Sequence, residues 1–308
     1  MNSTPAKLPY RFIDSHCHLD ANEFIEDLSD MRERAREGGV DLCLIPAVDK
    51  NNFDTVCSLA HRFKDVYALG VHPLYTKDAS LEDLQLLRKH LARALCRTLN
   101  ELRDPLPCEF HLATNNTQTV DQRLVAIGEI GLDGAVKTLD WSKQIFFLEE
   151  QLKLAMEFDL PVVLHVRQAV DFVLKALRKF RVKGGIAHAF NGSLQQAEQF
   201  MDLGFKLGMG GALTYPRALH LRRLVQALPA QSIVLETDSP DIVPVWKYVS
   251  AELRAKGLAQ ARNEPSELPK IAQEIAGLRG VDLEELMILS TTNFLNVFNL
   301  NVSNLNAT

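Results

Sequence analysis

The stretch Phe12-Ile13-Asp14-Ser15-His16-Cys17-His18-Leu19 begins as a short apolar run and ends in two histidines separated by one residue. Side chains two positions apart point the same way on a β-strand, so His16 and His18 present both imidazoles to one side. Such a pair suits two ligands of one metal ion, although two buried, hydrogen-bonded histidines would give the same pattern. The choice depends on whether later strands also end in metal-binding residues.

Length and composition indicate a globular chain with a large core. The 308 residues are 46% hydrophobic and 24% charged, and the formal net charge is -5. This charge gives no general attraction to nucleic acid or to an anionic membrane. Any phosphate-bearing substrate would therefore be held locally, by metal ions or by a few arginines.

Cysteine usage and the first ten residues favour a reducing cytoplasm. The five cysteines include no C-x-x-C pair, so neither a disulfide scaffold nor a thiolate zinc site is expected. Residues 1–10 lack the apolar core of a signal peptide, and no run approaches the ~18 apolar residues of a membrane span. We expect a cytoplasmic monomer without membrane contact and without an obligate protein partner.

Eight short apolar runs alternate with longer amphipathic stretches. Runs this short, flanked by Gly or Pro, are typical of strands buried on both faces. The expected strands are 11–16, 42–48, 66–70, 124–128, 162–164, 185–187, 205–209 and 233–235. This alternation predicts an α/β fold of parallel strands, the (β/α)8 TIM barrel, as a single domain spanning 1–308.

The intervening stretches have helical spacing. In residues 141–158, Ile145, Leu148 and Leu152 recur close to the helical period, and Ser193 is a suitable N-cap for a later helix. The other expected helices are 169–180, 193–203 and 218–228 around a barrel core of about 11–240, and C-terminal helices at 266–278 and 282–298 that cover the end of the barrel.

Two irregular stretches interrupt this pattern. The polar insertion at 100–122 precedes the fourth strand, so we expect a loop on the N-terminal face, away from the chemistry. Residues 239–265 follow the eighth strand, so they lie on the C-terminal face and would wall a pocket there.

Residues that commonly bind metals follow the predicted strands. They are His16 and His18, His72, Glu129, His165, His188 and Asp238. In a closed parallel barrel, the carboxyl ends of all strands converge on one rim. Five of the nine histidines stand at these ends, whereas packing gives a core histidine no reason to prefer one end of a strand.

Four imidazoles and two carboxylates exceed the three protein ligands that one catalytic zinc usually takes. We therefore predict two divalent ions bridged by a carboxylate. The assignment is His16, His18 and Asp238 on one ion, His165 and His188 on the other, and Glu129 shared. Two ions ~3.5–4 Å apart polarise a phosphoryl oxygen and activate water. The predicted catalytic residues are Glu129 and Asp238, with Asp238 accepting the proton of that water.

Four further residues are predicted to contact substrate: His72, Arg167, Asn191 and Arg262. Arg167 should share a face with His165, and a phosphate clamp is favoured over an ion pair. His72 precedes Pro73, so it either contacts metal or substrate or only shapes the strand end. Asn191 would place backbone N–H groups near an anion, and Arg262 has a weaker claim because surface arginines are common.

Three polar residues near the rim have structural interpretations. Glu236 is interpreted as a salt-bridge partner, although alternation puts it on the same side as Asp238. Asp133 is expected to close a glycine-flanked turn rather than bind metal. Cys17 stands between the two histidines, so alternation should turn it away from them into the core.

Several different short motifs follow one another along the chain. They are Asp14-Ser15-His16-Cys17-His18-Leu19-Asp20, Gly70-Val71-His72-Pro73, Gly128-Glu129-Ile130-Gly131-Leu132-Asp133, His165-Val166-Arg167, His188-Ala189-Phe190-Asn191-Gly192, Leu235-Glu236-Thr237-Asp238-Ser239-Pro240 and Arg262-Asn263-Glu264-Pro265. Together they resemble the TatD-type metal-dependent deoxyribonucleases of the amidohydrolase superfamily, over about residues 11–298. Their combination is highly specific, although any single motif is weak.

The resemblance implies a TIM barrel with two or three divalent ions that hydrolyses phosphodiester bonds in DNA. It implies a magnesium-assisted exonuclease, which we expect to act 3′→5′, with Zn²⁺ or Mn²⁺ as alternative ions. It also supports the six metal ligands assigned above. Gly134 departs from the aromatic residue often found after the Gly-Leu-Asp motif, and the stretch 100–122 is longer than usual for the family.

Other functions stay open alongside a deoxyribonuclease. A hydrolase of the same architecture would act on a small phosphoester or an amide, or remove an ester-linked amino acid from tRNA. A non-catalytic metal-binding protein would have lost ligands, and none is lost. The polymerase–phosphatase type of barrel also starts with His-x-His, but it has seven strands, so the strand before Asp238 argues against it.

Overall fold

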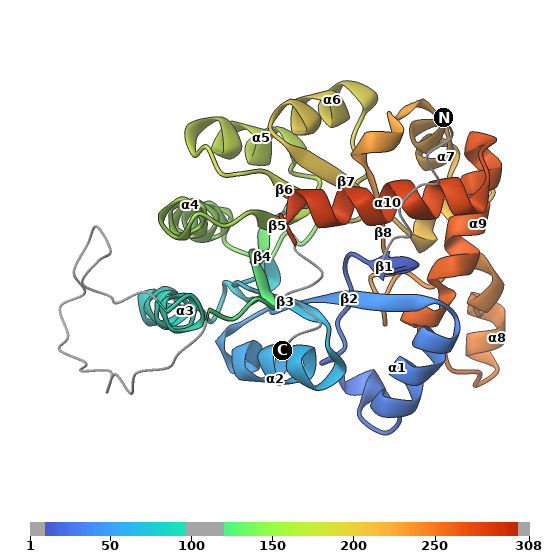
Figure 1. Cartoon of the computed structure of the whole chain (residues 1–308), viewed down its shortest axis with the longest axis horizontal. Coiled ribbons are helices and arrows are strands. Elements are labelled where there is room, and N and C mark those ends of the chain that lie inside the picture. Colours follow the sequence, from blue (N-terminus) through green and yellow to red (C-terminus); the bar gives the residue numbers. More distant parts are fainter. Residues whose placement is uncertain (1–9, 97–119, 301–308) are drawn as a thin grey trace, which may run out of the picture.

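Eight parallel strands, each hydrogen-bonded to the next in chain order, form the central sheet of the computed structural model, which describes residues 10–96 and 120–300 (Figure 1). The strands are β1 (Phe12–Asp14), β2 (Val40–Pro46), β3 (Val66–Leu69), β4 (Leu124–Asp133), β5 (Val162–Arg167), β6 (Gly185–Ala187), β7 (Phe205–Met209) and β8 (Ile233–Leu235). The predicted barrel of eight parallel strands is therefore confirmed.

The chain beyond β1 closes the barrel against the end of β8. β1 ends at Asp14, earlier than predicted, so His16 lies after the strand rather than at its end. Asp238 N donates a hydrogen bond to His16 O at 2.9 Å, and His18 N donates to Ser239 O at 2.8 Å. This strand-like pairing preserves the expected alternation and places Asp238 beside the two histidines.

Helices alternate with the strands and surround them (Figure 1). They are α1 (Leu28–Glu37), α2 (Phe53–Phe63), α3 (Leu81–Ala94), α4 (Trp141–Phe158), α5 (Val170–Lys179), α6 (Leu194–Asp202), α7 (Leu219–Ala227), α8 (Ala251–Ala255), α9 (Leu268–Arg279) and α10 (Leu283–Val297). Ser193 caps α6 as predicted, because its Oγ accepts a hydrogen bond from Gln196 N at 3.1 Å. No helix within 10–96 and 120–300 has the length and apolar character needed to cross a membrane.

Two strands are longer than the sequence predicts. β4 continues to Asp133 and β5 to Arg167, whereas their predicted ends are at 128 and 164. Pairing persists over the added residues, with Gly131 opposite His165 and Asp133 opposite Arg167. Glu129, His165 and Arg167 therefore project from paired strands rather than from loops, and side chains on such elements are held more firmly.

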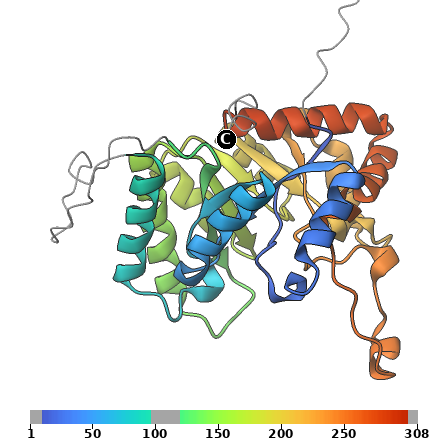
Figure 2. The same ribbon diagram turned by 60° about the horizontal axis from the view of Figure 1, so that its bottom comes forward.

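Apolar side chains fill the barrel from its amino end. The interior cluster comprises Ile13, Leu42, Leu44, Val66, Ala68, Val125, Ala126, Val163, Ile186 and Val234. Phe294 of α10 packs on this cluster, and α10 lies across one end of the barrel while α8 lies toward the other (Figure 2). Asn293 holds α10 in place, because its side-chain amide donates hydrogen bonds to the backbone oxygens of Ala230 and Ile233. Apolar packing thus seals the amino end, and polar groups gather at the carboxyl end.

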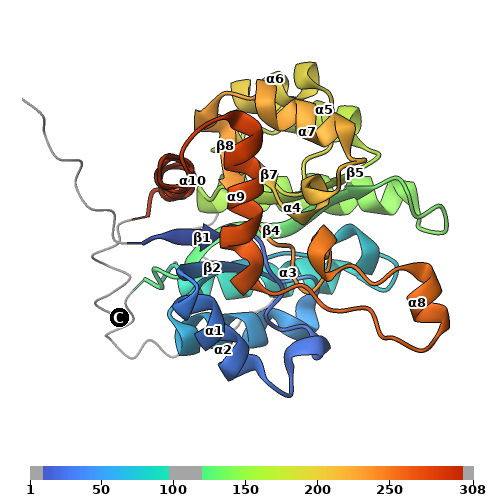
Figure 3. The ribbon, with the colours of Figure 1, turned by 90° about the vertical axis from the view of Figure 1, so that its right-hand side faces the viewer.

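The two irregular stretches expected from the sequence have different outcomes. Residues 239–265 follow β8 and extend beyond the carboxyl ends of the strands, with α8 in the projecting part (Figure 3). Pro240, Asp241 and Ile242 from the start of this stretch line the cavity described below, as expected of a pocket wall. The insertion predicted at 100–122 lies outside the described residues except for its last three positions.

Replacing Gly131 by alanine should lower the free energy of unfolding by about 2–3 kcal/mol. Gly131 has φ +152°, and a Cβ there would lie 1.9 Å from the backbone oxygen of His165. β4 and β5 would have to separate locally, which equilibrium urea denaturation measures. Gly277→Ala in α9 is the control, since its added Cβ meets no described atom within 4 Å and should stabilise the helix by about 0.5–1 kcal/mol. Wild-type stability of Gly131→Ala would contradict this close approach.

Candidate metal centre

The carboxylate of Glu129 lies at the centre of a polar cluster at the carboxyl end of the barrel. Its Oε2 lies 3.2 Å from His16 Nε2 and 3.6 Å from His18 Nε2. Its Oε1 lies 2.8 Å from His188 Nε2 and 3.1 Å from His165 Nδ1. The two oxygens face two different pairs of imidazoles, an arrangement that suits a carboxylate shared by two cations.

Asp238 joins the cluster from the end of β8. Its Oδ1 lies 3.5 Å from His16 Nε2, 3.8 Å from His18 Nε2 and 3.9 Å from His188 Nδ1. The backbone of Asp238 has φ +56°, in the left-handed region that aspartate and asparagine adopt more readily than most residues. The structure thus brings together all six residues that the sequence predicts as metal ligands.

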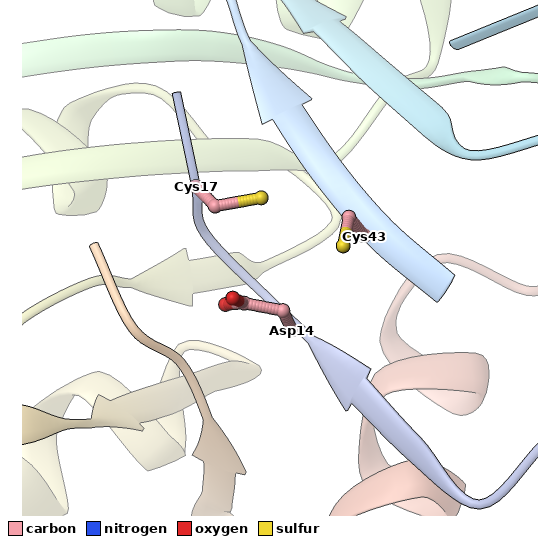
Figure 4. Close-up of side chains that lie close together, drawn as sticks. All are labelled: Asp14, Cys17 and Cys43. Carbon is pink, nitrogen blue, oxygen red and sulfur yellow. The ribbon is translucent and has the colours of Figure 1, made fainter. Parts of the chain in front are cut away.

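Asp14 fixes the backbone that carries two of these ligands. Its Oδ2 accepts a hydrogen bond from Thr237 Oγ1 at 2.6 Å, and its Oδ1 accepts from Thr237 N at 2.9 Å and from His16 N at 3.3 Å. These bonds join the chain after β1 to the chain after β8. Cys17 is fully buried and extends toward Cys43 on β2 (Figure 4), so it belongs to the core as expected.

The electrostatics of the cluster favour bound positive charge. Burial opposes ionisation of Glu129, but the surrounding imidazoles hold the pKa of its carboxyl well below the usual range. Burial alone would lower the pKa of His188, and contact with Glu129 raises it instead to about 10. The carboxylates therefore stabilise a cation at this position, whether a proton on an imidazole or a metal ion between the ligands.

Unpartnered buried atoms also fit a metal centre. Within the described part of the chain, the buried atoms without a hydrogen-bond partner include His16 Nδ1, His188 Nδ1 and Glu236 Oε2. Ligand atoms within 4.8 Å of one another form three overlapping groups in the cluster, namely His16, His188 and Asp238; His16, His18 and Glu129; and His72, Glu129 and His165. Imidazole and carboxylate donors suit Zn²⁺, Mn²⁺ and Mg²⁺ to different degrees, so these residues can hold divalent metal ions.

The cluster lies at the base of a cavity of about 840 Å³, and two predicted substrate contacts line its wall. Arg167 projects from β5 with a side chain that is 61% exposed, and its Nη1 lies 3.6 Å from Asp133 Oδ2. Asn191 follows β6 and is also exposed. Both side chains are therefore accessible to a molecule in the cavity.

His72 lies deeper than these two residues. Its Nε2 is 3.3 Å from Glu129 Oε1, and its Nδ1 accepts a hydrogen bond from Leu74 N at 3.2 Å. The ring is nearly buried but still lines the cavity. His72 thus caps the turn after β3 and also lies beside Glu129, while its contact with metal or substrate stays a prediction.

Arg262 lies outside the cavity, in contrast to its predicted contact with substrate. Its guanidinium pairs with Asp27 and with Glu264, and it lies 4.8 Å from the ring centroid of Phe24. These partners satisfy the positive charge and join the stretch after β8 to the residues before α1. The sequence motif places Arg262 near the C-terminal face and includes Glu264, but it does not reveal the pairing with the distant Asp27.

Two acidic residues for which the sequence predicts structural roles line the same cavity as the cluster. Asp133 does accept hydrogen bonds from the backbone of the following turn, but its Oδ2 also lies 3.2 Å from His165 Nε2. Glu236 lines the cavity, and its Oε1 accepts a hydrogen bond from Ala189 N rather than forming the expected salt bridge. Asp133 stands an even number of positions after Glu129, so both side chains lie on one face of β4 once this strand extends to Asp133. This spacing could have identified Asp133 as a neighbour of His165.

Comparison with known proteins assigns this arrangement to a family. The sequence model described as TatD related DNase matches residues 13–299. The chain belongs to the TatD family. The uncharacterized metal-dependent hydrolase YjjV of Escherichia coli (strain K12) is 34% identical over 292 residues, which cover 94% of this chain and 98% of YjjV. A TatD protein of Erwinia tasmaniensis, named a 3'-5' ssDNA/RNA exonuclease, is 30% identical over 292 residues, which cover 93% of this chain and 99% of that protein.

A solved structure from the TatD family has the same fold as this chain. The crystal structure of YjjV, a TatD homologue from Escherichia coli K12, superimposes with a TM-score of 0.78 at 33% identity and covers 94% of this chain and 99% of that one. The agreement extends over the whole barrel. This TatD-family chain is therefore a metal-dependent hydrolase.

Proposed function

We propose that this TatD-family hydrolase cleaves phosphodiester bonds in DNA and removes nucleotides from the 3′ end of a single strand. The observation that carries the proposal is that the two oxygens of Glu129 face two groups of imidazoles at the base of a cavity of about 840 Å³. A carboxylate shared between two cations is typical of phosphoryl transfer assisted by two metal ions. The Erwinia tasmaniensis relative, named a 3'-5' ssDNA/RNA exonuclease, supports this substrate class.

The clustered ligands would hold two divalent ions. His16, His18 and Asp238 would bind one ion, His165 and His188 the other, and Glu129 would be shared. Ions bound there would polarise a phosphoryl oxygen and make a coordinated water more acidic. Mg²⁺ is the proposed activating ion, with Mn²⁺ or Zn²⁺ as alternatives.

Asp238 would accept the proton of the attacking water. Its side chain is 14% exposed and lines the cavity, so it is open to water on one side and faces the imidazoles on the other. A general base must reach the proton that it takes within hydrogen-bond distance. The bonds from Thr237 to Asp14 hold the adjoining backbone, which keeps Asp238 in this position.

Arg167 and Asn191 would bind the phosphate groups of the substrate. Arg167 is the one lysine or arginine among the described residues that line the cavity. A guanidinium can donate two parallel hydrogen bonds to a phosphate, and most of this side chain is free to do so because it is 61% exposed. Asn191 lies at the same wall and would bind a neighbouring phosphate or sugar oxygen.

The charge of the cavity favours a second candidate, a hydrolase of small phosphoesters or amides. Besides the ligand cluster, the lining includes the acidic residues Asp20, Glu23, Asp133, Glu236 and Asp241. These carboxylates repel a long polyanion, and only Arg167 among the described lining residues offers fixed positive charge against them. A small substrate would bind beside the metal ions without crossing this acidic rim.

Removing metal should abolish hydrolysis, and adding Mg²⁺ or Mn²⁺ should restore it. Chelator-treated protein is mixed with a single-stranded oligonucleotide labelled at its 5′ end, alone and with each ion. We expect a ladder of products that shorten from the 3′ end, since the proposed activity begins there. Gel electrophoresis of the products, paired with metal analysis of the protein, gives the result.

A circular single strand of the same sequence is the control, because an exonuclease needs a free end. Circular DNA should persist while the linear strand is degraded. Equal cleavage of both would contradict exonuclease action. Intact linear DNA, together with metal-dependent hydrolysis of a small chromogenic phosphodiester or an amide, would instead support the second candidate.

A further inference from the structure

A second group of metal-binding side chains lies at the opposite end of the barrel from Glu129. The ligand atoms of Cys57, His61 and Asp121 lie within 4.8 Å of one another. Cys57 and His61 belong to α2, and Asp121 precedes the first residue of β4, whereas Glu129 lies toward the carboxyl end of that strand. None of the three takes part in the proposed hydrolysis.

The helix and the start of β4 present these side chains to one another. Cys57 and His61 are four positions apart on α2, so they lie on the same side of the helix. Asp121 Oδ2 lies 3.0 Å from His61 Nε2 and accepts a hydrogen bond from Tyr67 at 2.8 Å. Two helical side chains and one carboxylate from a distant part of the chain therefore converge.

The backbone around Asp121 is itself held in place. Asp121 N donates to Ala94 O at 2.8 Å, and Asp121 Oδ1 accepts from Arg123 N at 2.9 Å. Metal-binding carboxylates are commonly oriented by such outer hydrogen bonds. The His61 side chain is 47% exposed, so an ion can reach the cluster from solvent.

We propose that Cys57, His61 and Asp121 form a separate Zn²⁺ site, with a water molecule as the fourth ligand on the exposed side. Zinc takes a mixture of thiolate, imidazole and carboxylate ligands in tetrahedral sites, whereas magnesium prefers oxygen ligands. When the zinc–sulfur bond forms, the Cys57 thiol releases its proton to solvent. The absence of a C-x-x-C pair does not exclude this site, because two ligands come from helical spacing and the third from the fold.

A bound ion would link α2 to the start of β4 and, through the bond to Ala94, to the end of α3. Ions that bind only the folded chain stabilise it by mass action. The site would therefore strengthen the amino end of the barrel, independently of the hydrolytic centre. Zinc should raise the midpoint of thermal unfolding of wild-type protein more than that of a Cys57→Ser variant.

Cobalt(II) provides a selective test on the full chain. Co²⁺ bound to a thiolate absorbs in the near ultraviolet through sulfur-to-metal charge transfer, and the ligands assigned around Glu129 include no cysteine. We expect this band in wild-type protein, saturating at the absorbance of one thiolate-bound ion per chain and removed by excess Zn²⁺. It should be lost in Cys57→Ser and kept in the control Cys96→Ser.

Asp121→Asn and His61→Ala extend the test to the other two ligands. Each should weaken Zn²⁺ binding by about 100-fold or more, measured by competition with a chromogenic chelator. Asn keeps the shape of Asp121, so circular dichroism should show an unchanged fold. No charge-transfer band in wild-type protein, or an unchanged band in Cys57→Ser, would overturn the proposal, and neither result depends on DNA hydrolysis.

Discussion

Replacing Asp238 by asparagine should reduce the proposed phosphodiester hydrolysis by about 1000-fold while the barrel stays folded. The amide cannot accept the proton of the attacking water, and it contributes no negative charge beside His16 and His18, which lie within 3.8 Å of Asp238 Oδ1. Asparagine tolerates the left-handed backbone at this position, where φ is +56°. Cleavage of the labelled oligonucleotide under single-turnover conditions measures the loss.

Asp241→Asn is the matched control for this variant. Asp241 also lines the cavity, and its substitution removes the same negative charge. Among the described residues, no ligand of the proposed centre forms an ion pair or a hydrogen bond with Asp241. Its activity should stay close to wild type. Metal analysis of Asp238→Asn then separates a lost base from a lost ion, because the base alone would leave the metal content unchanged. Wild-type cleavage by Asp238→Asn would remove the proposed mechanism.

Asp65→Asn should lower the free energy of unfolding by about 3–5 kcal/mol. Asp65 and Arg32 form a fully buried ion pair, with Arg32 Nη2 2.6 Å from Asp65 Oδ1 and Nε 2.8 Å from Oδ2. The substitution keeps the shape of the side chain but leaves the guanidinium charge buried without a counter-ion. Equilibrium urea denaturation followed by circular dichroism measures the change.

Asp159→Asn makes the same chemical change at an exposed ion pair. Asp159 pairs with Lys183 at 2.6 Å, and both side chains are more than half exposed. Solvent screens such pairs, so the expected change in stability is below about 1 kcal/mol. Similar losses in the two variants would show that burial does not set the strength of the Arg32–Asp65 pair.

The position of the ligand cluster could be predicted from the sequence because it follows from periodicity. His16, Glu129, His165, His188 and Asp238 each follow or end a short apolar run, and parallel strands in a closed barrel carry such residues to one rim. The prediction depends on local alternation and on strand number, and the eight parallel strands confirm the strand number. Glu129 has its Oε2 beside His16 and its Oε1 beside His188, and the assignment of the ligands to two ions stays a prediction.

Other features depend on partners that are distant in the sequence. Asp133 reaches His165 because β4 and β5 keep pairing beyond their apolar segments, and hydrophobic pattern does not report that extension. Arg262 leaves the cavity because Asp27, more than two hundred positions earlier, neutralises it. Cys57 and His61 meet Asp121 only where α2 packs beside the start of β4.

The barrel, the order of its strands and the set of residues at the carboxyl rim follow from the amino-acid pattern alone, because burial and alternation are local properties of the chain. Contacts between distant side chains became evident only in the folded protein, since an ion pair such as Arg262–Asp27 depends on the distance between atoms after folding. The difference between local pattern and distant contact explains why the predicted ligands lie together while Arg262, a predicted substrate contact, lies outside the cavity.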